Sequence, residues 1–341
     1  MKVSVIVPVF NGDRWLIQSL ESLFSQTLRG FEIILIDDGS QDNTPKILSK
    51  IKDSRLKVIS FRRNKGIVHA LNAGIKVARG KYIARHDIDD LSKHLRLEKQ
   101  FDFLESHPNV HILATRAELI DEEDNSLEGV EATFLEKFNN AIVTQSDIKR
   151  ALPLVNPIFH GSVMMRKDAL KKAGGYNLDY QFVEDYELWL RMIDEFNFHK
   201  LGERLYVYRS HQDQVRNQKA KFLQLMTIKI KLNYLQRKFF DNRRNLKIFI
   251  QGTGVNSQYY GEIAKIKKLN VIGYVKRFIY NGQTFLGKPI ISYNQLISEP
   301  QWDIFALTNI EKAQEQSALL LESLKGKYLR IGNFIIHKNS S

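Results

Sequence analysis

The chain has 341 residues, no cysteine and a formal net charge of +13 at pH 7. The lack of cysteine excludes disulfides and thiolate metal sites, and the length predicts two domains. The excess of positive charge indicates an anionic partner, such as a phosphorylated substrate or an anionic membrane surface. Neither zinc-finger spacing nor an aromatic RNA-binding signature occurs in the sequence, so no nucleic-acid partner is expected.

Residues 1–115 alternate short apolar or β-branched runs with amphipathic stretches. The runs predict strands over 3–9, 32–37, 56–61, 82–85 and 110–114. The stretches between them predict helices over 15–25, 44–51, 67–78 and 95–105. Such alternation is typical of a parallel α/β sheet. Ligands bind these sheets beyond the carboxyl ends of the strands, so 8–11, 37–40 and 87–90 should share one rim.

Three carboxylates, Asp87, Asp89 and Asp90, follow the strand predicted over 82–85. In extended chain Asp87 and Asp89 point to the same side. Two oxygen ligands there suit Mg²⁺ or Mn²⁺, with phosphate oxygens completing the shell. The alternative is a solvated acidic turn that caps the next helix. His86 alternates to the opposite face from Asp87 and is expected to pack or to support the site from behind.

The middle of the chain is harder to interpret. Residues 116–160 are acidic and irregular, which favours an insertion or a flexible loop, whereas 183–194 predicts a helix and 200–208 a strand. Residues 216–247 carry many Lys and Arg residues among apolar ones, against the single acid Asp241. They predict a basic amphipathic helix that either packs on the first domain as a connection or lies on an anionic membrane surface.

A second small α/β pattern starts at Leu246. It predicts strands over 247–251, 271–275, 289–291, 303–307 and 328–331 and helices over 258–267 and 312–324. The turn Gly252-Thr253-Gly254 joins a strand to a helix and suits phosphate contact, but Ser257 replaces the third glycine of a dinucleotide fingerprint. A tight turn needs glycine for backbone reasons alone. The predicted organisation is therefore three parts, 1–215, a helical linker at 216–245 and a Rossmann-like domain at 246–341.

An ordered set of motifs in the first 210 residues resembles family 2 glycosyltransferases. The segments are VSVIVPVFNG (3–12), SLFSQT (22–27), EIILIDDGSQDNT (32–44), RNKGIVHALNAGI (63–75), GKYIARHDIDD (80–90), HGSVMMRKDAL (160–170) and EDYELWLR (184–191). The order, more than any single segment, makes the match specific. The resemblance implies an α/β GT-A nucleotide-sugar-binding domain with a mostly parallel central sheet. It also implies transfer of a sugar from a nucleotide-sugar to an acceptor hydroxyl.

On the donor side, the resemblance implies that Asp38 accepts a hydrogen bond from a uracil imide or a ribose hydroxyl. Asp37 and Ser40 are left to bond the turn. Pro8, Val9 and Asn11 edge the base, and Lys65 either faces the phosphates or lies in a solvated loop. In the family's metal motif, Asp87 contacts the nucleoside. Asp89 ligates the Mn²⁺ or Mg²⁺ ion that bridges the diphosphate, and the ion stabilises the departing charge.

On the acceptor side, the resemblance implies that Asp185 is the base of an inverting transfer and takes the hydroxyl proton. Glu184 then orients the acceptor, although acids in a first helical turn also suit the helix dipole. His160 either lies near the donor sugar or is an ordinary packed histidine. His211 corresponds to a downstream histidine that some relatives add to the metal shell, because imidazole binds Mn²⁺.

The sequence thus predicts a metal-dependent inverting glycosyltransferase that uses a UDP-sugar in surface polysaccharide or glycolipid synthesis. Its partners would be a nucleotide-sugar donor and a saccharide or lipid-linked acceptor. A cytoplasmic location is expected, with peripheral contact at the inner face of the cell membrane through 216–247. One alternative is a catalytically silent nucleotide-sugar-binding protein that acts through its C-terminal domain. A nucleotidyltransferase is another, but 10–13 lacks the phosphate loop it needs.

Overall fold

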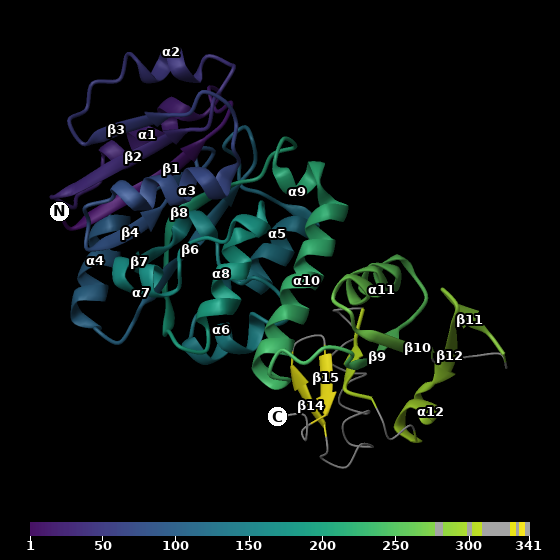
Figure 1. Ribbon diagram of the computed structural model, residues 1–341. Helices are drawn as coiled ribbons and strands as arrows, with labels where there is room; N and C mark the ends of the chain where they lie inside the picture. Colours follow the sequence, from purple (N-terminus) through teal and green to yellow (C-terminus); the bar gives the residue numbers. More distant parts are fainter. Residues whose placement is uncertain (277–281, 299–301, 309–327, 332–333, 338–341) are drawn as a thin grey trace. The chain divides into compact units, whose positions relative to one another are not determined.

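The chain forms two compact units, each built around its own sheet. The computed structural model describes residues 1–276, 282–298, 302–308, 328–331 and 334–337. One unit comprises 1–149 with 156–218, and the other comprises 150–155 with 219–341. Figure 1 colours the chain from purple to teal through the first unit and from green to yellow through the second. The predicted three-part division stays a prediction.

The first unit contains an eight-stranded mixed sheet. In spatial order its strands are β3 (Leu56–Ser60), β2 (Phe31–Asp37), β1 (Val3–Val9), β4 (Tyr82–Arg85), β7 (Met164–Arg166), β6 (Ile112–Ile120), β8 (Phe198–Arg209) and β5 (Leu91–Ser92). Strands β3, β2, β1 and β4 run parallel, as do β6 and β8, while β7 and β5 pair antiparallel. The predicted α/β fold is confirmed, and β1, β2 and β4 deliver their carboxyl ends to one rim.

Helices cover both faces of this sheet. The helices between residues 1 and 218 are α1 (Leu16–Phe24), α2 (Thr44–Leu48), α3 (Ile67–Val77), α4 (Arg96–Ser106), α5 (Gly129–Leu135), α6 (Gln145–Ala151), α7 (Lys167–Lys172), α8 (Glu184–Met192) and α9 (Val215–Gln218). Leu20 of α1 and Leu97 of α4 share a core cluster with Val5. On the other face, α3 approaches Ile6 and Ile36 so closely that a Cβ at Gly74 would lie within 2.8 Å of both. Because successive side chains of a strand point to opposite faces, the sheet contributes apolar side chains to a core on each side.

The prediction that 116–160 is an irregular insertion is wrong. Strand β6 continues to Ile120, and α5, a π-helical turn (Glu136–Asn140) and α6 follow. Asn140 anchors this region to the sheet, since its side chain accepts from the Ala117 N–H and donates to the Ala117 carbonyl at 2.8 and 2.9 Å. Sequence acidity misled the interpretation because Glu136 pairs with Arg204 of β8 rather than lying free in solvent.

The described residues of the second unit form a seven-stranded sheet. Its order is β11 (Thr284–Phe285), β12 (Lys288–Ser292), β10 (Asn270–Lys276), β9 (Lys247–Gln251), β13 (Ile304–Ala306), β15 (Phe334–His337) and β14 (Tyr328–Ile331). Strands β12, β10, β9 and β13 run parallel, and α11 (Val255–Ile266) joins β9 to β10. Helix α12 (Tyr293–Ser298) follows β12. The helix predicted over 312–324 lies outside the described residues.

The basic segment forms the long helix α10 (Ala220–Phe239), which belongs to the second unit. The prediction of one apolar face is wrong. Seven of its residues between 228 and 236 are buried: Ile228, Ile230, Lys231, Leu232, Tyr234, Leu235 and Gln236. At 100° per residue they surround about two thirds of the helix axis, so this part is a core helix. In the described part of the chain, no helix combines the length and apolarity needed to cross a bilayer.

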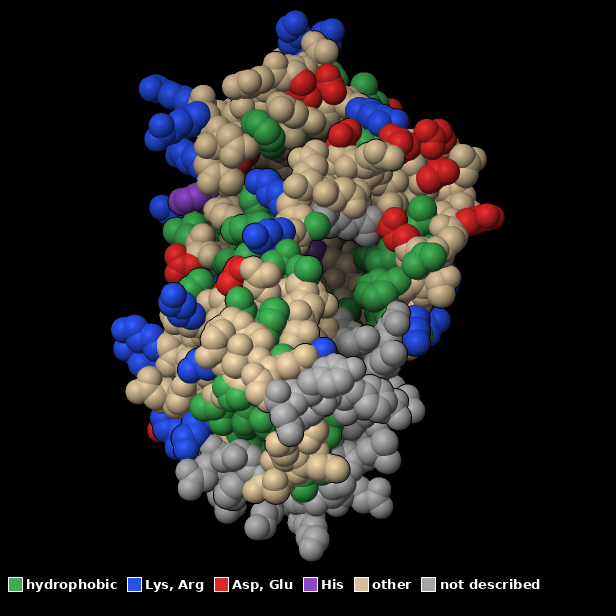
Figure 2. Space-filling view, turned by 90° about the vertical axis from the view of Figure 1, so that its right-hand side faces the viewer, with side chains coloured by type: hydrophobic (Ala, Val, Ile, Leu, Met, Phe, Trp, Pro, Cys, Tyr) green, Lys and Arg blue, Asp and Glu red, His purple; other side chains and the backbone are tan. Residues whose placement is uncertain are grey.

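Surface charge is unevenly distributed. On the face drawn in Figure 2, Lys and Arg side chains lie at several separate places, including the middle, and most of the visible acidic side chains lie at the upper right. The +13 net charge therefore does not concentrate into one basic patch on this face.

Candidate active site

The rim at the end of β1 and β2 is held together by short polar contacts. Asn11 has a left-handed backbone (φ 52°); its N–H donates to Ser40 Oγ at 2.9 Å and its Oδ1 accepts from the Gln41 N–H at 2.8 Å. The Asp38 N–H donates to the Val9 carbonyl at 2.8 Å. Pro8 and Val9 are buried within β1. The backbone edge at 9–11 thus has a fixed shape.

Asp37 bonds the turn as the sequence suggests, whereas the nucleotide contact of Asp38 stays a prediction. Asp37 Oδ1 accepts from the Ser40 N–H at 2.9 Å, so it bonds the turn. The two oxygens of Asp38 accept from the backbone N–H groups of Lys65 and Gly66 at 2.7 and 2.8 Å. Each carboxylate oxygen can accept a further hydrogen bond, so Asp38 shapes the 63–66 turn and keeps acceptor capacity for a ligand.

Gly39 and Lys65 show how closely these two turns approach. Gly39 has φ +75°, and a Cβ there would lie 2.6 Å from the Arg63 carbonyl carbon, so the position needs glycine. The Lys65 ammonium lies 4.5 Å from the centre of the Phe61 ring. This cation–π contact holds the exposed lysine on the rim.

Asp87, Asp89 and Asp90 lie in a turn, which corrects the expectation that they continue the strand. Strand β4 ends at Arg85, and the Asp90 N–H donates back to the Asp87 carbonyl at 3.2 Å. The three side chains therefore have separate partners: Asp87 Oδ1 pairs with Arg85 at 2.5 Å, Asp89 Oδ2 faces His211, and Asp90 Oδ1 accepts from the Arg209 N–H at 2.8 Å.

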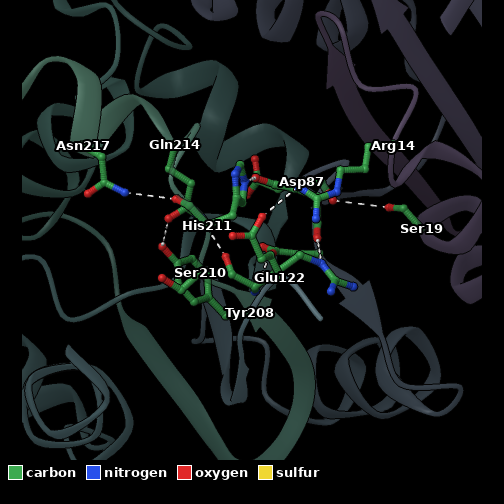
Figure 3. A network of polar contacts seen from close by, with 12 residues as sticks. Arg14, Ser19, Asp87, Glu122, Tyr208, Ser210, His211, Gln214 and Asn217 are labelled. Atoms are coloured by element: carbon green, nitrogen blue, oxygen red, sulfur yellow. Dashed lines mark hydrogen bonds and ion pairs between the residues drawn. The ribbon is translucent and has the colours of Figure 1, made fainter. Parts of the chain in front are cut away.

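His211 and Asp89 come together from positions 122 residues apart. His211 Nε2 lies 3.0 Å from Asp89 Oδ2, while Nδ1 is buried without a hydrogen-bond partner. The His211 ring packs against the Trp15 ring, with centroids 4.4 Å apart. Asn217 donates to the His211 carbonyl at 3.0 Å, and in Figure 3 Asn217 and Gln214 lie on one side of His211, with Arg14 and Ser19 on the other. The imidazole is thus fixed against the acidic turn.

The Asp89–His211 pair fits a divalent ion. Mg²⁺ and similar ions take ligands at about 2.0–2.1 Å and right angles, which places neighbouring ligand atoms about 3 Å apart. The observed 3.0 Å between Oδ2 and Nε2 has this spacing. Within the described ranges no cluster of three or more His, Asp or Glu side chains could hold a metal. The remaining ligands would have to come from phosphate oxygens and water.

Glu184 and Asp185 begin α8 and lie in a different environment. Asp185 Oδ2 accepts from Asn156 Nδ2 at 2.7 Å and Oδ1 from the Tyr186 N–H at 2.6 Å. Burial raises the pKa of Asp185 to about 6, against these two hydrogen bonds, which lower it. Burial and then the neighbouring Asp185 charge raise the pKa of Glu184 to about 8. Its Oε2 is buried without a hydrogen-bond partner.

His160 joins this group. Its Nε2 lies 2.7 Å from the Tyr176 hydroxyl and its Nδ1 lies 3.8 Å from Glu184 Oε1. Burial, and after it the charge of Arg85, lowers the pKa of His160 well below its ordinary value, so the ring is neutral. The next residue, Gly161, packs against the acidic turn, since a Cβ there would lie 2.7 Å from Asp87 Oδ2. The His160 segment therefore adjoins both carboxylate groups.

Arg85 is a site residue that sequence reasoning missed. Its side chain is 1% exposed and it donates to the His86 carbonyl as well as to Asp87. Burial works to lower its pKa, but the charges of Asp87 and Glu184, together with nearby tyrosines, raise it. Arg85 thus lies within electrostatic reach of both carboxylate groups. An arginine closing an apolar strand directly before three acids is the signal that could have found it.

His86 has the supporting role expected for it. The ring is fully buried between two serines, with Nε2 2.8 Å from Ser19 Oγ and Nδ1 3.0 Å from Ser92 Oγ. Burial lowers its pKa well below the ordinary value, so it is a neutral packing residue behind the acidic turn.

Comparisons with known proteins agree with this geometry. Residues 4–174 match the family described as glycosyl transferase family 2. An uncharacterized glycosyltransferase of Haemophilus influenzae is 30% identical over 85% of this chain and 88% of its own length. The amylovoran biosynthesis glycosyltransferase AmsE of Erwinia amylovora is 32% identical over 56% of this chain and 69% of its own.

Solved structures share the fold. TarS 1–349 of S. aureus, in complex with UDP-GlcNAc, has a TM-score of 0.54 at 18% identity and covers 78% of this chain and 80% of its own. The mannosyltransferase PcManGT of Pyrobaculum calidifontis, in complex with GDP-Man and Mn²⁺, has a TM-score of 0.50 at 18% identity and covers 69% and 63%. These neighbours have the GT-A fold that the motifs imply.

The chain belongs to glycosyltransferase family 2. It is an enzyme that transfers sugars, which argues against the alternative of a catalytically silent binding protein.

Proposed function

We propose that the chain is an inverting, metal-dependent transferase that moves a sugar from a UDP-sugar to an acceptor hydroxyl. The observation that carries the proposal is two carboxylate groups close enough to act on one another and on Arg85. Asp89 faces His211 at 3.0 Å, and Asp185, whose pKa burial raises to about 6, lies in the other group. The first suits a cation beside a diphosphate, and the second suits proton abstraction.

In this proposal Asp185 is the base. Its carboxylate takes the proton of the acceptor hydroxyl as that oxygen attacks the anomeric carbon, and the bond to the diphosphate breaks. A pKa of about 6 leaves the carboxylate ionised at pH 7 yet basic enough to accept a proton. Glu184 and neutral His160 line the sugar and acceptor side. The raised pKa of Glu184 makes it a hydrogen-bond donor to a sugar oxygen at neutral pH.

The donor side is assigned to the rim at the strand ends. The proposed nucleotide-binding residues are Pro8, Val9, Asn11, Asp38, Lys65 and Asp87. Asp89 and His211 would hold Mn²⁺ or Mg²⁺, which would neutralise the negative charge that develops on the leaving diphosphate. The complexes of TarS with UDP-GlcNAc and of PcManGT with GDP-Man and Mn²⁺ support a nucleotide-sugar and a divalent ion.

A role in surface polysaccharide or glycolipid synthesis at the cytoplasmic face of the membrane is also part of the proposal. The name of AmsE, an amylovoran biosynthesis enzyme, supports a saccharide acceptor. The first turn of α10, where Lys221 and Phe222 are exposed, supports peripheral contact with anionic lipid.

Calorimetric binding of UDP, GDP, CDP and TDP, each with Mn²⁺ and with EDTA, tests the proposal. We expect one diphosphate, UDP, to bind in the presence of Mn²⁺ and to lose most of its affinity in EDTA. Tighter binding of GDP would reassign the donor base while keeping the metal site. Binding of UDP that EDTA leaves unchanged would contradict the metal assignment.

A further inference from the structure

Asn156 is an amide that touches the carboxylate proposed as the base. Its Nδ2 donates to Asp185 Oδ2 at 2.7 Å, while Asp185 Oδ1 accepts from the Tyr186 N–H at 2.6 Å. The two oxygens of the carboxylate are thus each held by one donor, from different segments of the chain. A carboxylate fixed at both oxygens has one orientation but keeps lone pairs for a proton.

The amide of Asn156 is itself held in place. Its Oδ1 accepts from the Ile158 N–H at 3.2 Å, which leaves Nδ2 as the group directed at Asp185. The Asn156 carbonyl accepts from Asn139 Nδ2 at 3.3 Å. The orientation of the side-chain amide is therefore set by its own local hydrogen bonds.

A buried lysine fixes the backbone around Asn156. The Lys200 side chain, fully buried on β8, donates from Nζ to the Asn139 carbonyl at 2.5 Å and to the Pro157 carbonyl at 2.7 Å. Lys200 therefore connects Pro157, the residue after Asn156, to Asn139, whose side chain donates to the Asn156 carbonyl. An ammonium or amine that satisfies two buried carbonyls is costly to remove, so this clamp is rigid.

We propose that Asn156 is a positioning residue for the transfer reaction: its amide N–H orients Asp185 toward the acceptor and favours the ionised carboxylate, and Lys200 fixes Asn156 through the adjoining backbone. The proposal rests on the proposed role of Asp185. The side-chain amide of Asn156 bonds Asp185 and the Ile158 N–H, and its backbone carbonyl accepts from Asn139, so both the amide and the backbone that carries it are held.

The charge environment explains why the position suits an amide. The groups that act electrostatically on Asp185 or its neighbour are Arg85 from β4, Asp87 from the acidic turn, Glu184 from α8, and Tyr176. Two of these are carboxyls, so a neutral donor at 156 offsets repulsion that a third acid would increase. Consistently, the Asn156 hydrogen bond lowers the pKa of Asp185 against the effect of burial.

Two substitutions separate hydrogen bonding from packing. Asn156→Asp keeps the shape but loses the donor and adds negative charge, whereas Asn156→Ala loses shape and donor. We expect Asn156→Ala to lower kcat about 10- to 100-fold, and Asn156→Asp to lower it further. In both, the acidic limb of the kcat profile should move up by about one pH unit, with KM for the donor nearly unchanged. Asn197→Asp, an exposed amide in the same unit, is the matched control.

The assay measures diphosphate release by the full chain with Mn²⁺, using whichever of UDP-GlcNAc, UDP-galactose and GDP-mannose turns over fastest. The proposal would be overturned in favour of packing if Asn156→Asp lowered kcat less than Asn156→Ala. It would also be overturned if the acidic limb of the kcat profile stayed in place. Turnover of Asp185→Asn at the normal rate would instead overturn the base assignment, and with it this inference.

A second measurement needs no substrate. Urea midpoints of the wild type, Asn156→Ala, Asp185→Asn and the double variant form a cycle. We expect the effect of Asn156→Ala to shrink strongly in the Asp185→Asn background, because the charged partner is gone. Additive shifts in the midpoint would show that the two side chains do not interact and would overturn the proposal.

Discussion

The two carboxylate groups of the site have different polar partners. Asp87 and Asp89 face a guanidinium and an imidazole, at 2.5 and 3.0 Å. On α8, Asp185 faces a neutral amide, and Glu184 has one oxygen buried without a partner. Burial raises the pKa of Asp87 and the Arg85 guanidinium works against that rise, whereas burial raises the pKa of Asp185 to about 6 and that of Glu184 to about 8. In the proposed mechanism, the first group holds the metal and contacts the phosphates, and the second group transfers the proton.

The largest effect expected from this difference is at Asp89. Asp89→Asn replaces an anionic ligand by a neutral amide of the same shape and should lower kcat/KM about 10⁴-fold, since a metal contributes several kcal/mol to stabilising the leaving group. Calorimetric UDP binding should lose its Mn²⁺ dependence at the same time. Metal-dependent UDP binding that survives in Asp89→Asn would place the ion elsewhere.

We expect the second largest loss of activity from Asp185→Asn. This substitution should leave donor binding intact. Loss of a general base costs about 10²- to 10⁴-fold in rate, while the rim of β1, β2 and β4 is untouched. The check is kcat from diphosphate release beside the Kd for UDP with Mn²⁺. If UDP affinity fell along with kcat, the division of the site into a donor side and an acceptor side would be wrong.

The pH profile should report the acceptor side alone. With the pKa of Asp185 raised to about 6, the base is ionised above that pH and protonated below it. The rate should therefore fall about tenfold per pH unit below pH 6, level off above it, and decline again as Glu184 ionises near pH 8. Kinetic measurements between pH 4.5 and 8 would show it, and the residual rate of Asp185→Asn should lack the acidic limb. A rate that falls only near pH 4 would mean that the Asp185 carboxylate is solvated.

Much of the fold around the donor side could be predicted from the sequence, because strand periodicity and turn chemistry depend on neighbouring residues. Strands 3–9 and 82–85 match β1 and β4 residue for residue, and the Asp37 turn bond follows from residue type. The Asp89–His211 meeting spans 122 residues, and only the family resemblance suggested it. Asn156 and Arg85 had no such guide, because their roles depend on tertiary partners.

The prediction of one apolar face for 216–247 was wrong for a related reason. Sequence spacing records which residues are apolar but not how many elements pack around a helix. Lys231 shows this most clearly: among the basic residues it reads as solvent-exposed, yet it is buried on α10 and its Nζ donates to the Leu154 carbonyl at 2.6 Å.

The smallest expected effect is on the pH dependence of stability. It arises from one buried lysine in each unit. Burial lowers the pKa of Lys200 in the first unit and of Lys231 in the second to about 7. The unfolded chain, with an ordinary lysine pKa of 10.5, binds more protons between pH 7 and 10.5, so stability should rise with pH across this window. The gain should be roughly 1 kcal/mol per pH unit for each lysine.

Urea unfolding between pH 7 and 9.5 measures this slope. Lys200→Met should reduce it and also cost about 1–3 kcal/mol at all pH values, because two buried carbonyls lose their donor. Lys171→Met, at an exposed lysine of α7, is the control and should leave the slope unchanged. If the two units unfold in separate transitions, Lys200→Met should flatten one and Lys231→Met the other. A slope that survives both substitutions would mean that these ammonium groups stay charged in the folded chain, and that the buried carbonyls around them, rather than neutralisation, balance the cost of burial.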